Sequence, residues 1–156
     1  MEDDRTIPVI ETDKLIVRKS PLIPTHDETA GRGVFAKVPF KNGDVVEACP
    51  VIVEWHIKSA KKFHKSLWEY AFQWGGDDKA SALVLGFGSV YNHSQDNPNM
   101  EAEVWNDEEI MVYYAIRDIE AGDELLFDYS GGDKSILDNL WFTNTIDPLK
   151  KKKEKK

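Results

Sequence analysis

An amide, an imidazole and a hydroxyl stand in consecutive positions at Asn92, His93 and Ser94, shortly after the apolar run 83–87. A short apolar run that stops at polar residues and a Pro-Asn turn is typical of a buried strand that delivers side chains to a site. Polar groups left unsatisfied beside a core cost about 1–3 kcal/mol each. These residues therefore either satisfy one another in a structural turn or hold a ligand, and this segment alone favours neither.

Two further clusters could take part in the same chemistry. Gly31-Arg32-Gly33 is a tight turn whose backbone can approach a ligand closely, although its spacing is not that of a P-loop or a dinucleotide fingerprint. Tyr129 ends the apolar segment 124–129. Taken singly, an ordinary turn and a core tyrosine are the simpler interpretations. The four histidines lack metal-ligand spacing and Cys49 is the single cysteine, so we expect no metal site and a buried, unreactive thiol.

Several short strands are expected to position these clusters, over residues 15–18, 34–38, 45–55, 100–104, 109–117 and 124–129. Apolar residues recur at helical spacing over 58–72, which predicts one amphipathic helix. Asn42-Gly43 predicts a hairpin turn between the second and third strands. Many strands, one helix and no βαβ alternation favour a mostly β (α+β) domain of several small sheets.

Composition narrows the class of protein and of partner. A chain of 156 residues suits one domain, and no apolar stretch is long enough to span a membrane. The absence of a signal peptide and the single cysteine predict a soluble intracellular protein. The formal net charge is -8, yet residues 150–156 hold six lysines and one glutamate. An acidic body attracts basic polypeptides and repels nucleic acid, so we expect nucleic-acid contact only through this lysine-rich, disordered tail.

Three motifs in a fixed order form a much more specific signal than any one of them. They are Gly-x-Gly-Val-Phe-Ala from Gly31, Leu-Gly-Phe-Gly-x-x-Tyr-Asn-His-Ser from Leu85 with the Pro-Asn that follows, and Ala-Gly-Asp-Glu-Leu-x-Phe-Asp-Tyr from Ala121. Together they resemble the SET-domain protein-lysine methyltransferases, in style closest to the minimal viral and bacterial members. The resemblance implies an N-terminal extension (1–13), a SET domain (14–130), a closing segment (131–149) and the tail (150–156).

The resemblance also implies the reaction, which is transfer of methyl groups from S-adenosylmethionine to a lysine side chain of a basic protein such as a histone. Tyr129 would be the catalytic tyrosine. The cofactor site would comprise Arg32, Gly33, Phe35, Tyr70, Asn92, His93 and Tyr129. The lysine channel would comprise Tyr91, Phe127 and Trp141. Phe127 occupies a position where the family varies between Phe and Tyr, and Phe there implies di- or trimethylation.

The resemblance further implies that the segment 92–94 and the segment ending at Tyr129 pack in a knot-like threading. Two features depart from the family pattern: one extra residue precedes Pro98, which predicts a bulged turn, and no cysteine-rich zinc segment follows Tyr129. We expect Trp141 or Phe142 to close the channel instead. The alternative interpretation is a SET-fold binding module that has lost turnover. A nuclear or chromatin location and a dimer are both compatible with the sequence.

Overall fold

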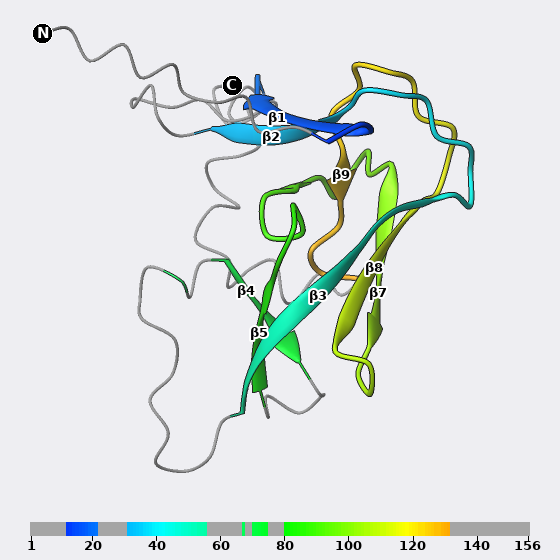
Figure 1. Cartoon of the computed structure of the whole chain (residues 1–156). Helices are drawn as coiled ribbons and strands as arrows, with labels where there is room; N and C mark the ends of the chain where they lie inside the picture. The colour runs from blue at the N-terminus through cyan, green and yellow to red at the C-terminus, as the bar shows by residue number, and fades with distance from the viewer. Residues whose placement is uncertain (1–11, 22–30, 56–66, 68–69, 75–79, 132–156) are drawn as a thin grey trace, which may run out of the picture.

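The computed structural model describes residues 12–21, 31–55, 67, 70–74 and 80–131 of the chain (Figure 1). Every element with defined bounds within these residues is a strand, which confirms the prediction of a mostly β fold. The strands are β1 (Leu15–Lys19), β2 (Arg32–Ala36), β3 (Val45–Trp55), β4 (Ala71–Trp74), β5 (Ala80–Val84), β6 (Asn92–His93), β7 (Met100–Trp105), β8 (Ile110–Ala115) and β9 (Leu126–Phe127).

The strands form one antiparallel ribbon and one large, mixed sheet. β1 and β2 make the ribbon, and the second sheet has the order β4-β5-β3-β8-β7-β9-β6. The long strand β3 joins two parts of this sheet, because residues 45–50 pair with β8 and residues 51–55 pair with β5. Figure 1 shows β3 crossing the molecule between these two partners, with the β1–β2 ribbon at one end. The expected small sheets are therefore present, but two of them are continuous through β3.

The core lies between the curled sheet and the ribbon, and both contribute side chains to it. The largest side chains that are fully buried are those of Trp74, Tyr91, Tyr113, Met100, Ile119 and Leu125. Cys49 is also completely buried, as expected for a structural thiol, and burial raises its pKa. Burial of rings and branched chains supplies most of the driving force for folding.

The predicted helix over 58–72 is wrong at its C-terminal end. Ala71 and Phe72 begin strand β4, which pairs antiparallel with β5. The reason is tertiary: the ring of Phe72 packs against Phe127 and Tyr129, while Trp74 is buried two residues further along. In a strand, side chains two residues apart point to the same face, so Phe72 and Trp74 can both pack inward. Pairing with β5 provides hydrogen bonds for the backbone of this segment. Of the rest of the predicted helix, the structure describes Leu67, which is helical, and Tyr70, which lies in a turn; residues 58–66 and 68–69 lie outside the described residues.

Two other local predictions are corrected. The Asn42-Gly43 turn does not close a hairpin, because β2 pairs with β1 and β3 pairs with β5 and β8. The apolar run 83–87 is a strand only to Val84, and turns follow it before β6. Gly86 adopts a φ of 62°, a left-handed conformation that extended chain does not have. In contrast, the predicted hairpin of 100–104 and 109–117 is confirmed as β7 and β8.

The last strand of the sheet lies between two earlier ones. β9 pairs in parallel with β6 on one side, with His93 opposite Phe127, and with the start of β7 on the other. Asn99, which is buried, fixes this arrangement: its Oδ1 accepts the Leu126 amide and its Nδ2 donates to the Glu124 carbonyl, both at 2.8 Å. The expected packing of 92–94 against the segment ending at Tyr129 is confirmed.

Candidate functional site

The three sequence clusters meet at one place in the fold. The side-chain amide of Asn92 donates to the carbonyl oxygen of Arg32 at 2.9 Å and to Oε1 of Glu124 at 2.8 Å. The hydroxyl of Ser20 donates to the other oxygen of Glu124, also at 2.8 Å. These bonds tie the start of strand β2, strand β6 and the residues just before β9 into one unit. The predicted tight turn over 31–33 is wrong, because Arg32 and Gly33 are the first two residues of β2.

A glycine is required inside this unit. A Cβ atom on Gly33 would lie 2.1 Å from Oε1 of Glu124 and 3.0 Å from Nδ2 of Asn92, which is too close for any side chain. We call Ser20, Gly33, Asn92 and Glu124 the Glu124 cluster. Ser20 and Glu124 are not among the predicted site residues. The signal in the sequence was an acidic residue placed directly before the apolar run 125–127.

His93 and Tyr129 are joined by backbone as well as by their rings. The backbone amide of Tyr129 donates to Nδ1 of His93 at 3.0 Å, and the ring centroids are 5.1 Å apart. The carboxylate of Asp128 lies 3.9 Å from the same nitrogen. Burial lowers the pKa of His93 and outweighs the opposite influence of Asp128. The imidazole is therefore held neutral, with Nδ1 as a hydrogen-bond acceptor.

Tyr129 is set into an aromatic wall. Its ring lies 4.7 Å from that of Phe127 and 5.9 Å from that of Phe72, and its hydroxyl donates to the carbonyl oxygen of Tyr91. Phe127 is also 5.2 Å from the ring of Tyr113. Burial, with the charge of Glu124 as a smaller cause, raises the pKa of Tyr129. The residue is consequently a phenol, not a phenolate, at neutral pH.

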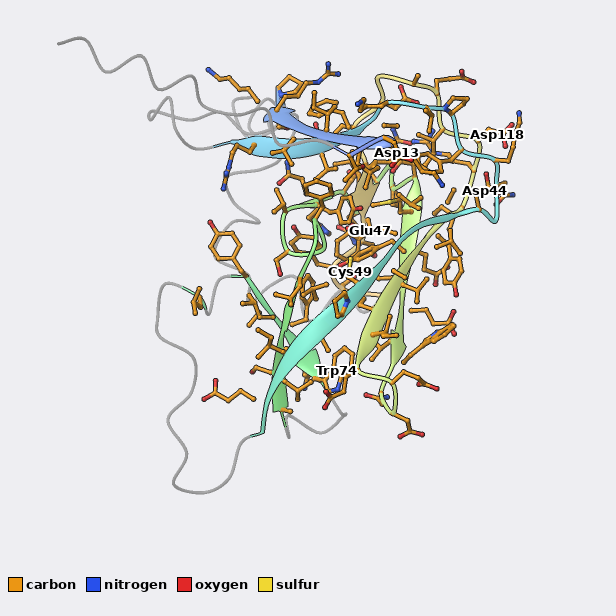
Figure 2. The ribbon with its side chains drawn as sticks, in the orientation of Figure 1. Asp13, Asp44, Glu47, Cys49, Trp74 and Asp118 are labelled. Carbon is orange, nitrogen blue, oxygen red and sulfur yellow. The ribbon has the colours of Figure 1, made fainter. Side chains whose placement is uncertain are left out.

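A second carboxylate, that of Glu47, is bonded to the side chain of Tyr91. Oε2 of Glu47 accepts the hydroxyl of Tyr91 at 2.6 Å, and Oε1 accepts the amide of Phe87 at 3.1 Å. A Cβ on Gly86 would lie 2.4 Å from Oε1. We call Glu47, Gly86, Phe87 and Tyr91 the Glu47 cluster. Figure 2 shows Glu47 on β3, next to Cys49, at the centre of the molecule.

The remaining predicted site residues have different surroundings. Phe35 is buried, and the Arg18 guanidinium lies 4.0 Å from the centre of its ring. Arg32 is exposed and meets Asn92 through its carbonyl oxygen. Tyr70 is 49% exposed just before β4, where its carbonyl accepts the hydroxyl of Ser89. The residue Trp141 lies outside the part of the chain that the structure describes.

The described residues contain neither a candidate metal centre nor a candidate membrane-spanning helix. No group of three or more His, Cys, Asp or Glu side chains there could hold a metal ion. No helix in the same part of the chain is long and apolar enough to cross a membrane. The site therefore comprises a neutral histidine and a protonated tyrosine beside a group of aromatic rings, with Gly33 of β2 linked to them through Asn92 and Glu124.

Comparison with known proteins identifies the family. A family model described as the SET domain matches residues 31–130. A histone-lysine N-methyltransferase of Schizosaccharomyces pombe, named as specific for lysine 37 of H3, is 32% identical over 132 residues, which are 83% of this chain and 82% of that protein. The histone-lysine N-methyltransferase set-1 of Caenorhabditis elegans is 31% identical over 134 residues, which are 76% of this chain and 54% of that protein.

A solved structure agrees with these sequence matches. The crystal structure of a Plasmodium falciparum protein described as a candidate histone methyltransferase has a TM-score of 0.59 and 29% identity. The match covers 80% of this chain and 99% of that chain. The chain therefore belongs to the SET-domain family of protein-lysine methyltransferases.

Proposed function

We propose that the chain transfers methyl groups from S-adenosylmethionine to a lysine side chain in a basic protein, with a histone as the leading candidate. The observation that carries this proposal is the convergence of the start of β2, the Asn92–His93 strand and Tyr129, three segments that are far apart in sequence. Family membership gives the reaction class. The residue roles below are inferred from this geometry.

The Glu124 cluster and His93 fit a methyl-donor site. The carboxylate holds the Asn92 amide against the Arg32 carbonyl, which fixes the start of β2 relative to β6. Backbone groups around Gly33 and Phe35, together with Asn92 and His93, would hold the cofactor, with Tyr70 at its border. When bound, S-adenosylmethionine supplies an electrophilic methyl group on a sulfonium. The contribution of the protein is then to hold the two reacting groups in line.

The aromatic wall suits the lysine side of the reaction. A lysine must be neutral to attack, but its ordinary pKa is about 10.4. A channel lined by the rings of Phe127 and Tyr129 excludes water and lowers that pKa, because burial disfavours the ammonium form. Tyr91 and Trp141 complete the channel in this proposal. No dedicated general base is required once the amine is desolvated.

Tyr129 acts as an orienting group in this mechanism. Because its pKa is raised, it keeps its proton at neutral pH, and that proton is donated to the Tyr91 carbonyl. We propose that the hydroxyl oxygen faces the amine and the methyl group. Loss of the hydroxyl should slow the methyl-transfer step far more than it weakens binding of either substrate.

A basic substrate fits the charge of the surface. The hairpin of β7 and β8 exposes five carboxylates, which are those of Glu101, Glu103, Asp107, Glu108 and Glu109. Acidic surfaces attract lysine-rich segments and speed their encounter. The names of the fission yeast and nematode relatives favour a histone among basic proteins, and with it a nuclear or chromatin location.

The decisive test is incubation of the protein with labelled S-adenosylmethionine and a panel of histones and other basic proteins. We expect wild type to methylate a lysine and Tyr129→Phe to lose at least about a hundredfold in kcat with cofactor affinity retained. Cofactor binding by calorimetry without transfer to any protein would favour the binding module instead. No binding of S-adenosylmethionine would contradict both interpretations.

The degree of methylation has its own test. Phe127 is 3% exposed and packs on Tyr129, so a hydroxyl at this ring would reach into the space beside the reacting amine. We propose that wild type makes di- or trimethyl-lysine and that Phe127→Tyr shifts the product toward monomethyl-lysine. Mass spectrometry of the methylated peptide measures the distribution. An unchanged distribution would contradict this role for Phe127.

A further inference from the structure

One carboxylate that the proposed reaction does not use is linked to Tyr129 through a single residue. Glu47 accepts the hydroxyl of Tyr91 at 2.6 Å, and the carbonyl oxygen of Tyr91 accepts the hydroxyl of Tyr129. Tyr91 therefore contacts the Glu47 carboxylate through its hydroxyl and the proposed catalytic Tyr129 through its backbone carbonyl. The direction of the Tyr129 hydroxyl depends on where this carbonyl lies.

The surroundings hold Tyr91 in one orientation. Its side chain is 1% exposed, and its ring centroid is 4.7 Å from that of Tyr113, whose own hydroxyl donates to the Gly88 carbonyl at 3.0 Å. The second oxygen of Glu47 accepts the Phe87 amide, where a side chain on Gly86 would collide with it. Neither the carboxylate nor the buried phenol can turn without leaving polar groups unsatisfied.

We propose that Glu47 is a positioning residue for methyl transfer. By fixing the hydroxyl of Tyr91, it fixes the carbonyl oxygen that receives the proton of Tyr129. The Tyr129 oxygen then presents its lone pairs to the amine and the methyl group in one direction. This inference rests on the proposed function, because it takes Tyr129 as the residue that touches the reacting groups.

A positioning role predicts a specific kinetic pattern for Glu47→Gln. The amide keeps the size of the side chain, but its single oxygen can accept only one of the two hydrogen bonds. Misplacement of an orienting group slows the chemical step and leaves binding intact. We expect kcat to fall by about tenfold, the equivalent of one net hydrogen bond, with KM for both substrates within about twofold.

Coupling between residues separates this role from a general loss of structure. Tyr91→Phe removes the same hydrogen bond from its other end, so its kcat should fall by a similar factor. The double variant should be no slower than either single variant, because both changes break one link. The matched control is Glu54→Gln on the same strand, since Oε2 of Glu54 is buried and has no hydrogen-bond partner within the described part of the chain. This control should keep the wild-type kcat.

A second measurement does not depend on turnover. The chain has five tyrosines, so ¹³C-tyrosine labelling gives a spectrum that single Tyr→Phe variants can assign. Glu47→Gln should shift the ring signals of both Tyr91 and Tyr129, whereas Glu54→Gln should leave them in place. If Glu47→Gln does not fold, kcat and the Tyr129 ring signals can both be measured in Tyr91→Phe, which keeps the aromatic ring.

Three results would overturn the inference: wild-type kcat in folded Glu47→Gln, multiplied losses in the double variant, or unmoved Tyr129 signals. Failure of the proposed function is distinguishable from these. If wild type methylates no protein, the function is wrong, and the tyrosine spectra alone decide whether Glu47 positions Tyr129.

Discussion

The Glu124 cluster and the Glu47 cluster are built alike. In each, one carboxylate accepts two hydrogen bonds. In each, a glycine leaves the room that the carboxylate fills, with a hypothetical Cβ at 2.1 Å from Glu124 and 2.4 Å from Glu47. The similarity is chemical, since a carboxylate is the only ordinary side chain that accepts on both oxygens.

The clusters differ in what they hold. Glu124 is bonded to side chains, and through Asn92 it is linked to the backbone at the start of β2. Glu47 is bonded to a buried phenol and fixes the aromatic interior. Damage to the first cluster should therefore change ligand affinity, and damage to the second should change stability and the chemical step. A carboxylate that accepts two hydrogen bonds beside a glycine is thus present in both clusters, but its bonding partners differ.

The largest effect is expected from Gly86→Ala. Gly86 has a φ of 62°, so alanine introduces backbone strain and also displaces the Glu47 carboxylate. We expect the free energy of unfolding to fall by about 2–4 kcal/mol in urea denaturation, with cofactor affinity of the folded protein unchanged. The control is Gly131→Ala, because Gly131 has a φ of 58° with nothing within 4 Å. Equal losses at both positions would mean that the carboxylate contact contributes nothing.

Gly33→Ala should produce the complementary result. The new Cβ would push Oε1 of Glu124 away and separate it from Asn92, which weakens the link between β2 and β6. We expect a loss of about 1–3 kcal/mol in stability and at least tenfold weaker cofactor binding, about 1.4 kcal/mol, by calorimetry. Gly86→Ala serves as the matched control for affinity. Unchanged cofactor affinity in Gly33→Ala would remove the functional difference between the clusters.

His93, which lies next to Tyr129, should give a pH-dependent effect. Burial lowers its folded-state pKa below the unfolded value of about 6.5, so the unfolded chain binds more protons below that pH. Its contribution to stability is complete above about pH 6.5 and is lost as the pH falls through the folded pKa. His93→Asn keeps an acceptor near the Tyr129 amide but cannot titrate, so its stability should depend less on pH.

Urea denaturation from about pH 5 to 8 measures this difference between wild type and His93→Asn, and the other histidines cancel in the comparison. The nearby Asp128 favours the charged imidazole, so Asp128→Asn should lower the pKa of His93 further. The stability of this variant should then fall more than that of wild type as the pH is lowered. Parallel pH profiles for wild type and His93→Asn would contradict the neutral state of His93.

The smallest effect is expected from Ser20→Ala. It removes one hydrogen bond to Glu124 and leaves the bond from Asn92 in place. We expect about 1 kcal/mol of stability and about twofold in cofactor affinity to be lost, measured by the same two methods. In a Glu124→Gln background the substitution should cost less, because the stronger charged acceptor is already gone. Full additivity of the two changes would show that Ser20 acts elsewhere.

Part of the fold and of the site could be predicted from the sequence. Strand patterns predicted the mostly β fold, and the order of three motifs pointed to the family. The meeting of Asn92 and His93 with the segment ending at Tyr129 was predicted only through the resemblance to that family. Local signals failed where distant contacts compete with them. Phe72 has helical spacing but lies in a strand, because its ring packs on residues more than fifty positions away. Asn42-Gly43 is a good hairpin turn, but its two strands pair with other partners.

What the sequence by itself determined is local: which residues carry amides, hydroxyls and rings, and where glycine allows the backbone to turn. Only the tertiary structure decided which carboxylates these groups meet. Glu124 reaches Ser20 across 104 positions, and Glu47 reaches Tyr91 across 44. Nothing in the local pattern around either glutamate indicates such a partner. The physical reason is that buried polar groups must be satisfied by whatever the fold brings within hydrogen-bond distance, and that choice follows from strand order.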